Sequence, residues 1–229
     1  TVISREYSSE WKLGDEPYYP VNDEKNGALY ARYKKMAELL YQGHGSYRIV
    51  SNEGVVIYVD PYAGEGYEMP ADIVIVTHEH SDHNQVDLVT LKDDGVILRH
   101  GDLFVDGEYP IKKIKKVMIE GTPAENKNHT REECVGFIMT VDGITLYGTG
   151  DTNYYPEMES FNDLDYALLP VDGIYNMSAQ EASRCAHVID SRYFIPIHTS
   201  PTQLYDEDIA KSFKSPHALY MKPGERLKL

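Results

Sequence analysis

The chain has 229 residues, with 22 Lys and Arg against 37 Asp and Glu, which gives a formal net charge of −15 at pH 7. A hydrophobic fraction of 41% with 26% charged residues is typical of a folded domain and excludes a disordered chain. The strong negative charge, without a basic stripe, argues against a nucleic-acid partner, and the lack of an apolar run of about 18 residues argues against a membrane span.

The two cysteines, Cys134 and Cys185, form no C-x-x-C pair, which is typical of a protein from a reducing compartment. The first residues also lack the charged, apolar and small-residue series of a signal peptide. We therefore expect a cytoplasmic protein. Its expected partner is a small-molecule substrate, and assembly into a homo-oligomer is compatible with the sequence.

The first 20 residues are rich in Tyr and Pro and predict extended or turn structure. Asn22 or Asp23 then provides a suitable helix N-cap. Apolar side chains recur after it at helical spacing and predict one amphipathic helix: Leu29, Tyr33, Met36 and Leu40.

From residue 39 the hydrophobic period becomes that of strands. The predicted strands are Tyr47–Val50, Val55–Val59, Ile73–Val76, Val96–Leu98, Lys116–Ile119, Val135–Val141, Ile144–Tyr147, Tyr166–Leu169 and Tyr193–Pro196. Turn residues at Asn52–Gly54 and Asp142–Gly143 predict hairpins. Ser178 and Glu181 form a capping-box pattern for a helix over Ala179–Val188. Hairpins followed by strand-helix-strand units predict two sheets packed face to face with helices outside.

The segment Thr77–His83 carries the residues that most clearly indicate chemistry. His78 and His80 are two residues apart, so on a loop leaving a strand both can face one centre, whereas Asp82 and His83 can face a second. Imidazole nitrogen and carboxylate oxygen suit Zn²⁺, and Mn²⁺ or Fe²⁺ is also compatible. The alternative is a solvated polar loop, but these groups at H-x-H-x-D-H spacing would repel one another on protonation without a cation.

With this motif the sequence resembles the metallo-β-lactamase superfamily, and further residues follow in the family's order over residues 38–229. Asp60 after an early strand resembles the aspartate that supports the ligand loop. Asp151 in Gly148–Thr152 resembles the bridging aspartate, and His129 and His198 resemble the later histidine ligands. The resemblance implies an α+β fold, a four-layer αββα sandwich of two mixed sheets with outer helices.

The resemblance also implies two divalent metal ions, with zinc favoured over manganese or iron. One ion would be held by His78, His80 and His129, the other by Asp82, His83 and His198, with Asp151 between them. Asp82 and Asp151 are the expected catalytic residues: Asp82 would help orient a hydroxide shared by the two metals, and Asp151 would lie between the metals. The expected activity is metal-dependent hydrolysis, of lactonase, esterase or phosphodiesterase type, of a small ester, lactone or phosphoester.

Within the superfamily, Gly43–Ser46 and Leu169–Ala182 resemble the L-ascorbate-6-phosphate lactonase-like hydrolases. Two departures stand out: Asp172-Gly173 replaces Gly-Gly, and His129 is followed by Thr130-Arg131-Glu132 instead of the familiar [TS]-x-G. Two assignments therefore keep alternatives. His129 is a ligand or a loop histidine, and His44 is a substrate contact or a turn residue.

Residues 1–37 resemble the C-terminal region of UDP-galactopyranose mutase, notably at Arg5–Trp11 and Gly14–Asn26. The chain lacks a G-x-G-x-x-G turn after a strand, so no flavin site is expected and no cofactor-binding residue is assigned. We expect residues 1–37 to be a remnant with one helix, and residues 38–229 to form the hydrolase domain. The alternative function is a nucleotide-sugar binding or accessory protein without flavin chemistry.

Overall fold

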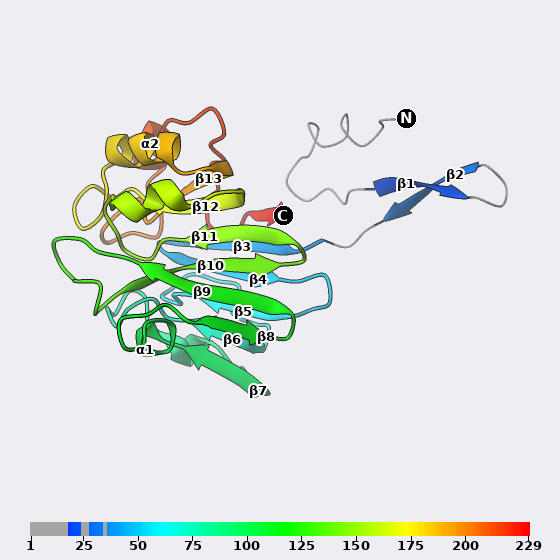
Figure 1. Cartoon of the computed structure of the whole chain (residues 1–229), viewed down its shortest axis with the longest axis horizontal. Coiled ribbons are helices and arrows are strands. Elements are labelled where there is room, and N and C mark those ends of the chain that lie inside the picture. The colour runs from blue at the N-terminus through cyan, green and yellow to red at the C-terminus, as the bar shows by residue number, and fades with distance from the viewer. Residues whose placement is uncertain (1–17, 24–27, 34–35) are drawn as a thin grey trace.

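A computed structural model describes residues 18–23, 28–33 and 36–229. Two six-stranded sheets stack face to face (Figure 1). Sheet 1 has the order β14 (Arg226–Lys228), β3 (Glu38–Gly43), β4 (Ser46–Val50), β5 (Val56–Val59), β6 (Ala71–Ile75), β7 (Leu91–Leu98). Sheet 2 has the order β13 (Ser191–Ile197), β12 (Leu164–Pro170), β11 (Ile144–Gly148), β10 (Val135–Val141), β9 (Val117–Pro123), β8 (Ile111–Ile114).

Both sheets are mixed. In sheet 1, β5, β6 and β7 run parallel and the other neighbours pair antiparallel. In sheet 2, β11, β12 and β13 run parallel, and β8 to β11 pair antiparallel. The two hairpin predictions are confirmed, since β4 pairs antiparallel with β5 and β10 with β11.

The main core lies between the sheets. Its fully buried side chains alternate along the strands, as expected for strands with one face on the core, and include Ile49, Ile57 and Ile73 from sheet 1 and Phe137 and Leu168 from sheet 2. Both inner faces are almost wholly apolar, so burial of this surface drives the packing of the sheets.

The helices α2 (Ala179–Val188) and α3 (Glu207–Ser212) lie outside sheet 2. Helix α2 covers β12 and β13 (Figure 1), and its Ala182 and Cys185 pack with Phe213, next to α3. Ser178 caps α2 by accepting the Glu181 backbone N–H, as the capping-box pattern predicts. The other helices among the described residues are short: α1 (His100–Leu103) and the 3₁₀ helices η2 (Val86–Leu88) and η3 (Pro156–Ser160).

The outer face of sheet 1 is covered differently. Tyr58 and Val74 point away from the main core and pack with Tyr67 and Met69 of the β5–β6 loop and with Val86. On this side a loop and one 3₁₀ turn take the place of an outer helix layer. The predicted α+β sandwich of two mixed sheets is therefore confirmed, with its longer helices gathered outside sheet 2.

The predicted helix near the N-terminus is wrong. Residues 18–23 form β1 (Tyr18–Asp23) and residues 28–33 form β2 (Ala28–Tyr33), which pair antiparallel as a separate two-stranded sheet. Leu29 and Tyr33 thus belong to β2, whereas Leu40 belongs to β3. Aromatic side chains favour strands, and pairing with β1 outweighs the helical spacing. The predictions for residues 1–17 lie outside the described residues.

A buried carboxylate ties the sheets together at the edge opposite the ends of the parallel strands. Asp72, at the start of β6, is 2% exposed and accepts hydrogen bonds from Val56 N at 2.8 Å, Lys92 Nζ at 2.7 Å and Lys115 Nζ at 2.5 Å. Lys92 lies on β7 and Lys115 in the β8–β9 turn, so this contact joins sheet 1 to sheet 2.

Asp72→Ala should lower the free energy of unfolding by about 2 kcal/mol, since it removes charged hydrogen bonds and leaves Val56 N–H unpaired. Burial opposes the charged carboxylate, but hydrogen bonds from Lys115 and Lys92 lower the pKa of Asp72. The difference from wild type should therefore be present at neutral pH and shrink as the pH falls through that pKa. Urea unfolding measures it. Glu53→Ala, which breaks the exposed Lys116 pair, is the control and should change little; equal effects would contradict the assignment.

Candidate metal centre

The sheet topology brings the predicted ligand segments to one edge of the sandwich. Five of the six parallel strands that end there are followed within a few residues by a site residue, and β7 is the exception: Asp60 after β5, His78 after β6, Asp151 after β11, Asp172 after β12 and His198 after β13. The β3–β4 turn with His44 and the loop before β10 with His129 lie at the same edge, because β4 and β10 run antiparallel to their neighbours β5 and β11. Residues distant in the sequence therefore meet there.

Imidazole nitrogens surround the two carboxylates Asp82 and Asp151. His83 Nε2 lies 3.6 Å from Asp82 Oδ2 and 3.3 Å from Asp151 Oδ1. His198 Nε2 lies 3.7 Å from Asp82 Oδ2 and 3.6 Å from Asp151 Oδ2. Most of these distances are longer than a hydrogen bond. Two ligand atoms that each bind one tetrahedral Zn²⁺ at about 2.0–2.1 Å lie roughly 3.3–3.5 Å apart. These atoms are spaced like ligands of one cation.

A second group of imidazoles adjoins the first. His78, His80 and His129 each offer a nitrogen, and these nitrogens lie within 4.8 Å of one another. His78 Nε2 also lies 3.7 Å from Asp151 Oδ2, so Asp151 faces both groups. The structure thus brings His129 to the two histidines of the motif, which is where the resemblance places it.

In four of these rings, the nitrogen that points away from the centre contacts a protein oxygen. This contact leaves the other nitrogen of the ring to offer its lone pair to a cation. The contacts are His83 Nδ1 to Asp60 Oδ2 at 2.8 Å, His78 Nδ1 to Thr77 Oγ1 at 3.0 Å, His129 Nε2 to the Asp151 carbonyl at 2.6 Å and His198 Nδ1 to Asp172 Oδ2 at 2.9 Å. Carbonyl and carboxylate oxygens accept, so the nitrogen facing each of them carries the proton.

The nitrogens that face the centre are buried and have no hydrogen-bond partner within the described residues: Nε2 of His78, His83 and His198, and Nδ1 of His129. Nδ1 of His198 also forms no hydrogen bond of good geometry, and its contact with Asp172 Oδ2 at 2.9 Å is an ion pair. Buried polar atoms without partners are costly, and their convergence beside Asp151, which is 5% exposed, is the pattern that a cation would satisfy. The donor set of imidazole nitrogen and carboxylate oxygen fits zinc, manganese or iron.

In the absence of a cation, the carboxylates of the centre raise the pKa values of His83 and His198, so protons compete with a cation for these two rings. Burial opposes protonation of His198, but Asp151, Asp172 and Asp82 raise its pKa to about 9. Burial likewise opposes the charged form of Asp151, yet His83 and His198 hold its pKa well below the usual range. His78 differs, because burial and the neighbouring His83 lower its pKa, which keeps its lone pair free.

Asp60 lies behind the ligand loop, as expected. Its carboxylate accepts the Thr77 backbone N–H at 2.7 Å and the Thr77 hydroxyl at 2.6 Å, besides its contact with His83. Its oxygens are therefore occupied by the protein, and Asp60 orients a ligand rather than serving as one.

The sequence leaves two roles open for His44. Its ring is buried, and it lies in the β3–β4 turn with a φ of 54°. His44 Nε2 lies 2.8 Å from Asp82 Oδ2 and its ring centroid 3.7 Å from that of His198. The following Gly45 leaves room for the site, since a Cβ there would come within 2.9 Å of His83. The structure thus places His44 in the turn and in contact with Asp82, and a role in substrate binding stays a prediction.

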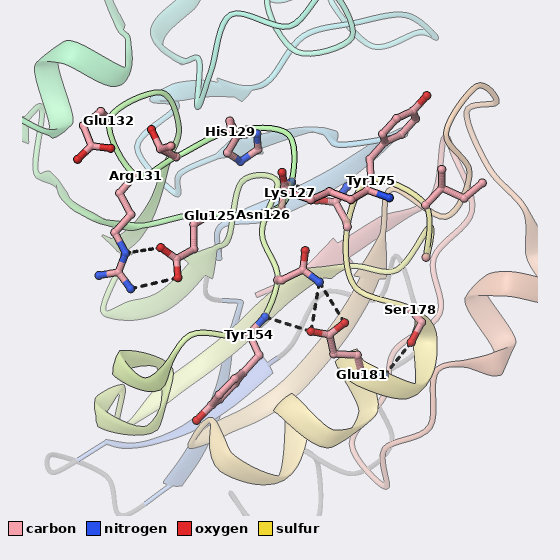
Figure 2. Close-up of a pocket in the computed structure, with 15 residues that line it drawn as sticks. Glu125, Asn126, Lys127, His129, Arg131, Glu132, Tyr154, Tyr175, Ser178 and Glu181 are labelled. Carbon is pink, nitrogen blue, oxygen red and sulfur yellow. Dashed lines mark hydrogen bonds and ion pairs between the residues drawn. The ribbon is translucent and has the colours of Figure 1, made fainter.

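A cavity of about 760 Å³ opens beside the centre, with His129 in its wall. Figure 2 shows His129 and Tyr175 on one side, Glu181 at the start of α2 on another, and Arg131 bound to Glu125. Arg131 also binds Glu157 on η3 at 2.6 Å, which anchors the loop that carries His129. The departure from the familiar motif after His129 thus supplies this loop with an ion-paired anchor.

The role of Asp172 was missed from the sequence, where it stood only as a departure from Gly-Gly. Its position in the sequence could have indicated a role in the site. Like Asp60 and Asp151, Asp172 is an aspartate shortly after a strand that ends at this edge. Its contact with His198 could not be read from spacing alone. The cavity-lining Tyr154 and Tyr175 carried no local motif either.

Comparisons with known proteins agree with this geometry. Residues 38–198 match the sequence model of the β-lactamase superfamily domain, and residues 1–47 match that of UDP-galactopyranose mutase. A UPF0173 metal-dependent hydrolase from Methanoculleus marisnigri is 32% identical over 191 residues, which cover 70% of this chain and 80% of that relative. Another, from Thermococcus onnurineus, is 27% identical over 231 residues, which cover 85% of this chain and 100% of that relative.

Among solved structures, Igni18, a metallo hydrolase from the hyperthermophilic archaeon Ignicoccus hospitalis, has the same fold. The TM-score is 0.67 at 22% identity, with 85% of this chain and 98% of that chain covered. Across the described residues, no helix has both the length and the apolarity needed to cross a membrane. The family match, the 32% identical relative and the fold lead to one assignment: the chain belongs to the metallo-β-lactamase superfamily, among its UPF0173 metal-dependent hydrolases.

Proposed function

We propose that the chain is a hydrolase that uses two divalent cations to cleave a small ester, lactone or phosphoester. The observation that carries this proposal is the convergence of buried, unpartnered imidazole nitrogens on the two faces of Asp151. One group, His83, His198 and Asp82, would hold one cation, and His78, His80 and His129 would hold the other. Lactones come first among the candidate substrates because of the resemblance at Gly43–Ser46 and Leu169–Ala182.

Two such cations would lower the pKa of a shared water toward neutrality and polarise the oxygen of the scissile bond. The residues of the chain hold the geometry. Asp151 is buried between the two groups, where its negative charge would offset that of the cations. The side chain of Asp82 is 29% exposed, so its carboxylate can accept a hydrogen bond from a water molecule on the solvent side. His44 donates to Asp82 and fixes its orientation.

The cavity supports a small substrate. Its volume of about 760 Å³ lies in the range of small-molecule sites, and Ile174 and Tyr175, about half exposed, offer apolar surface beside the amides of Asn126 and Asn153. The lining carries both signs of charge, with Lys127 and Arg131 opposite several carboxylates. Such a lining suits a compact polar molecule better than a polymer of one charge.

The metal content can be counted. We expect close to two transition-metal ions per chain after loading with Zn²⁺ or Mn²⁺, and His83→Ala should lose mainly one of them, because it removes one of about four ligands. The apparent affinity should rise with pH, because protons on His198, whose pKa is about 9, compete with the cation. Elemental analysis measures the ratio, with the exposed His187→Ala as control. A loaded wild type without bound metal would end the proposal.

Asp151→Asn tests the bridging role. The amide keeps the shape of the side chain but removes the charge that faces both groups. The rate of hydrolysis should therefore fall by more than roughly 100-fold, which exceeds the loss typical of mutating a residue that only hydrogen-bonds a metal ligand. Thermal unfolding of the metal-free chain should stay near that of wild type. The assay is a panel of lactones, thioesters and phosphodiesters, and Asp142→Asn in the exposed β10–β11 turn is the matched control. Near wild-type rates would show that Asp151 does not bridge.

The match of residues 1–47 to the mutase model favours a second candidate, nucleotide-sugar binding. We expect UDP-galactose not to bind tightly, since the matched segment covers only part of a mutase and the chain has no flavin motif. Calorimetry with the full chain is the measurement. Saturable micromolar binding that survives Asp151→Asn would make nucleotide-sugar binding the leading function.

A further inference from the structure

One carboxylate behind the metal centre also holds the wall of the cavity. Asp172 is 7% exposed and follows β12. Its Oδ1 accepts the backbone N–H groups of Ile174 at 2.7 Å, Tyr175 at 2.8 Å and Asn176 at 3.1 Å. Its Oδ2 accepts from Asn176 Nδ2 at 2.9 Å and lies 2.9 Å from His198 Nδ1. Oδ1 thus contacts the backbone of the loop, and Oδ2 contacts both the Asn176 side chain and the His198 ring.

The loop over residues 173–176 depends on this carboxylate. Gly173 to Asn176 line the cavity, and the side chains of Ile174 and Tyr175 are 50% and 47% exposed, so core packing holds them little. Besides Asp172, the backbone contact of Gly173 N with Met177 O at 3.0 Å closes the turn. Two longer contacts come from the loop before β10: Asn128 Nδ2 to Tyr175 O at 3.5 Å and Asn126 Nδ2 to Asn176 Oδ1 at 3.4 Å. Asp172 is therefore the main anchor of this wall.

We propose that Asp172 is a positioning residue that couples cation binding at His198 to the order of the cavity wall at residues 173–176. The inference rests on the proposed function, because it needs His198 to be a ligand. When His198 Nε2 binds a cation, Nδ1–H becomes a stronger donor, and the contact with Asp172 strengthens. The same carboxylate then holds the loop amides more firmly. By linkage, an ordered wall favours the cation to the same degree.

Asp172→Asn separates the two sides of the carboxylate. The amide oxygen can still accept the three loop N–H groups, whereas its NH₂ then faces His198 Nδ1 and Asn176 Nδ2, both donors in the wild type. The variant should therefore keep the three loop N–H contacts and lose the contacts of Oδ2 with His198 Nδ1 and Asn176 Nδ2. Asp165→Asn is the matched control, because Asp165 lies on β12 and accepts the Thr145 backbone N–H, away from the metal centre.

Two measurements on the full-length protein test the coupling, and neither uses activity. Chelator competition with Zn²⁺ should show an affinity about 10- to 100-fold weaker for one site in Asp172→Asn and unchanged in Asp165→Asn. Hydrogen exchange should show that Zn²⁺ slows the amides of Ile174, Tyr175 and Asn176 in the wild type and in Asp165→Asn. In Asp172→Asn these amides should exchange at the same rate with and without Zn²⁺.

The outcomes distinguish this inference from the proposed function. A wild type that binds no Zn²⁺ would overturn both. If the wild type binds Zn²⁺ while Asp172→Asn keeps its affinity and the zinc-dependent protection, the coupling alone is wrong and the proposed function stands. Loss of protection with wild-type affinity would likewise overturn the coupling, since Asp172 would then only brace the loop.

Discussion

The structure depends on concentrated charge at the edge of the sandwich where the parallel strands end. Asp60, Asp151 and Asp172 are each less than a tenth exposed there, among imidazoles that are equally buried. Buried carboxylates are tolerated when cations or hydrogen bonds compensate them. Asp60 and Asp172 receive several N–H and O–H donors from the chain, whereas Asp151 faces chiefly imidazoles. Asp151 is therefore the carboxylate that most needs an added cation.

Backbone strain accompanies this arrangement. His44, Asp60 and His198 have φ values of 54°, 45° and 47°, a left-handed conformation that is uncommon for residues other than glycine. Each of the three turns its side chain at the end of a strand or in a tight turn of the site edge. Such conformations persist where the surroundings over-determine them, and here strand pairing on one side and hydrogen bonds on the other do so.

Much of the fold and the centre of the site could be predicted from the sequence, because the signals are local. The motif from His78 to His83 lies in one loop, and α2 has its cap residue and its apolar face within a dozen residues. The helix predicted through Leu29 and Leu40 failed although the competing contact is also local. Residues 28–33 pair with the strand over residues 18–23 that directly precedes them, and this pairing outweighs the helical spacing of the apolar side chains.

The non-local parts of the site needed either a family resemblance or the coordinates. Asp151 and His198 could be named only because the resemblance supplied their order, and nothing in the spacing shows that His129 turns its Nδ1 toward His78 and His80. Asp172 illustrates the limit best. Its role arises from the curl of residues 173–176, which aims consecutive backbone N–H groups at one oxygen, and no residue type in that loop announces it.

The two edges of the sandwich meet the same electrostatic problem in different ways. At the far edge, Asp72 is neutralised by Lys92 and Lys115, flexible cations that the chain itself provides and that leave no open position. At the site edge the chain provides rigid imidazoles whose lone pairs remain unused. A lysine at the site edge would neutralise the carboxylates but would also occupy the space between the imidazoles. Leaving Asp151 without a lysine costs stability, but it keeps this space open for a cation that can also contact a substrate.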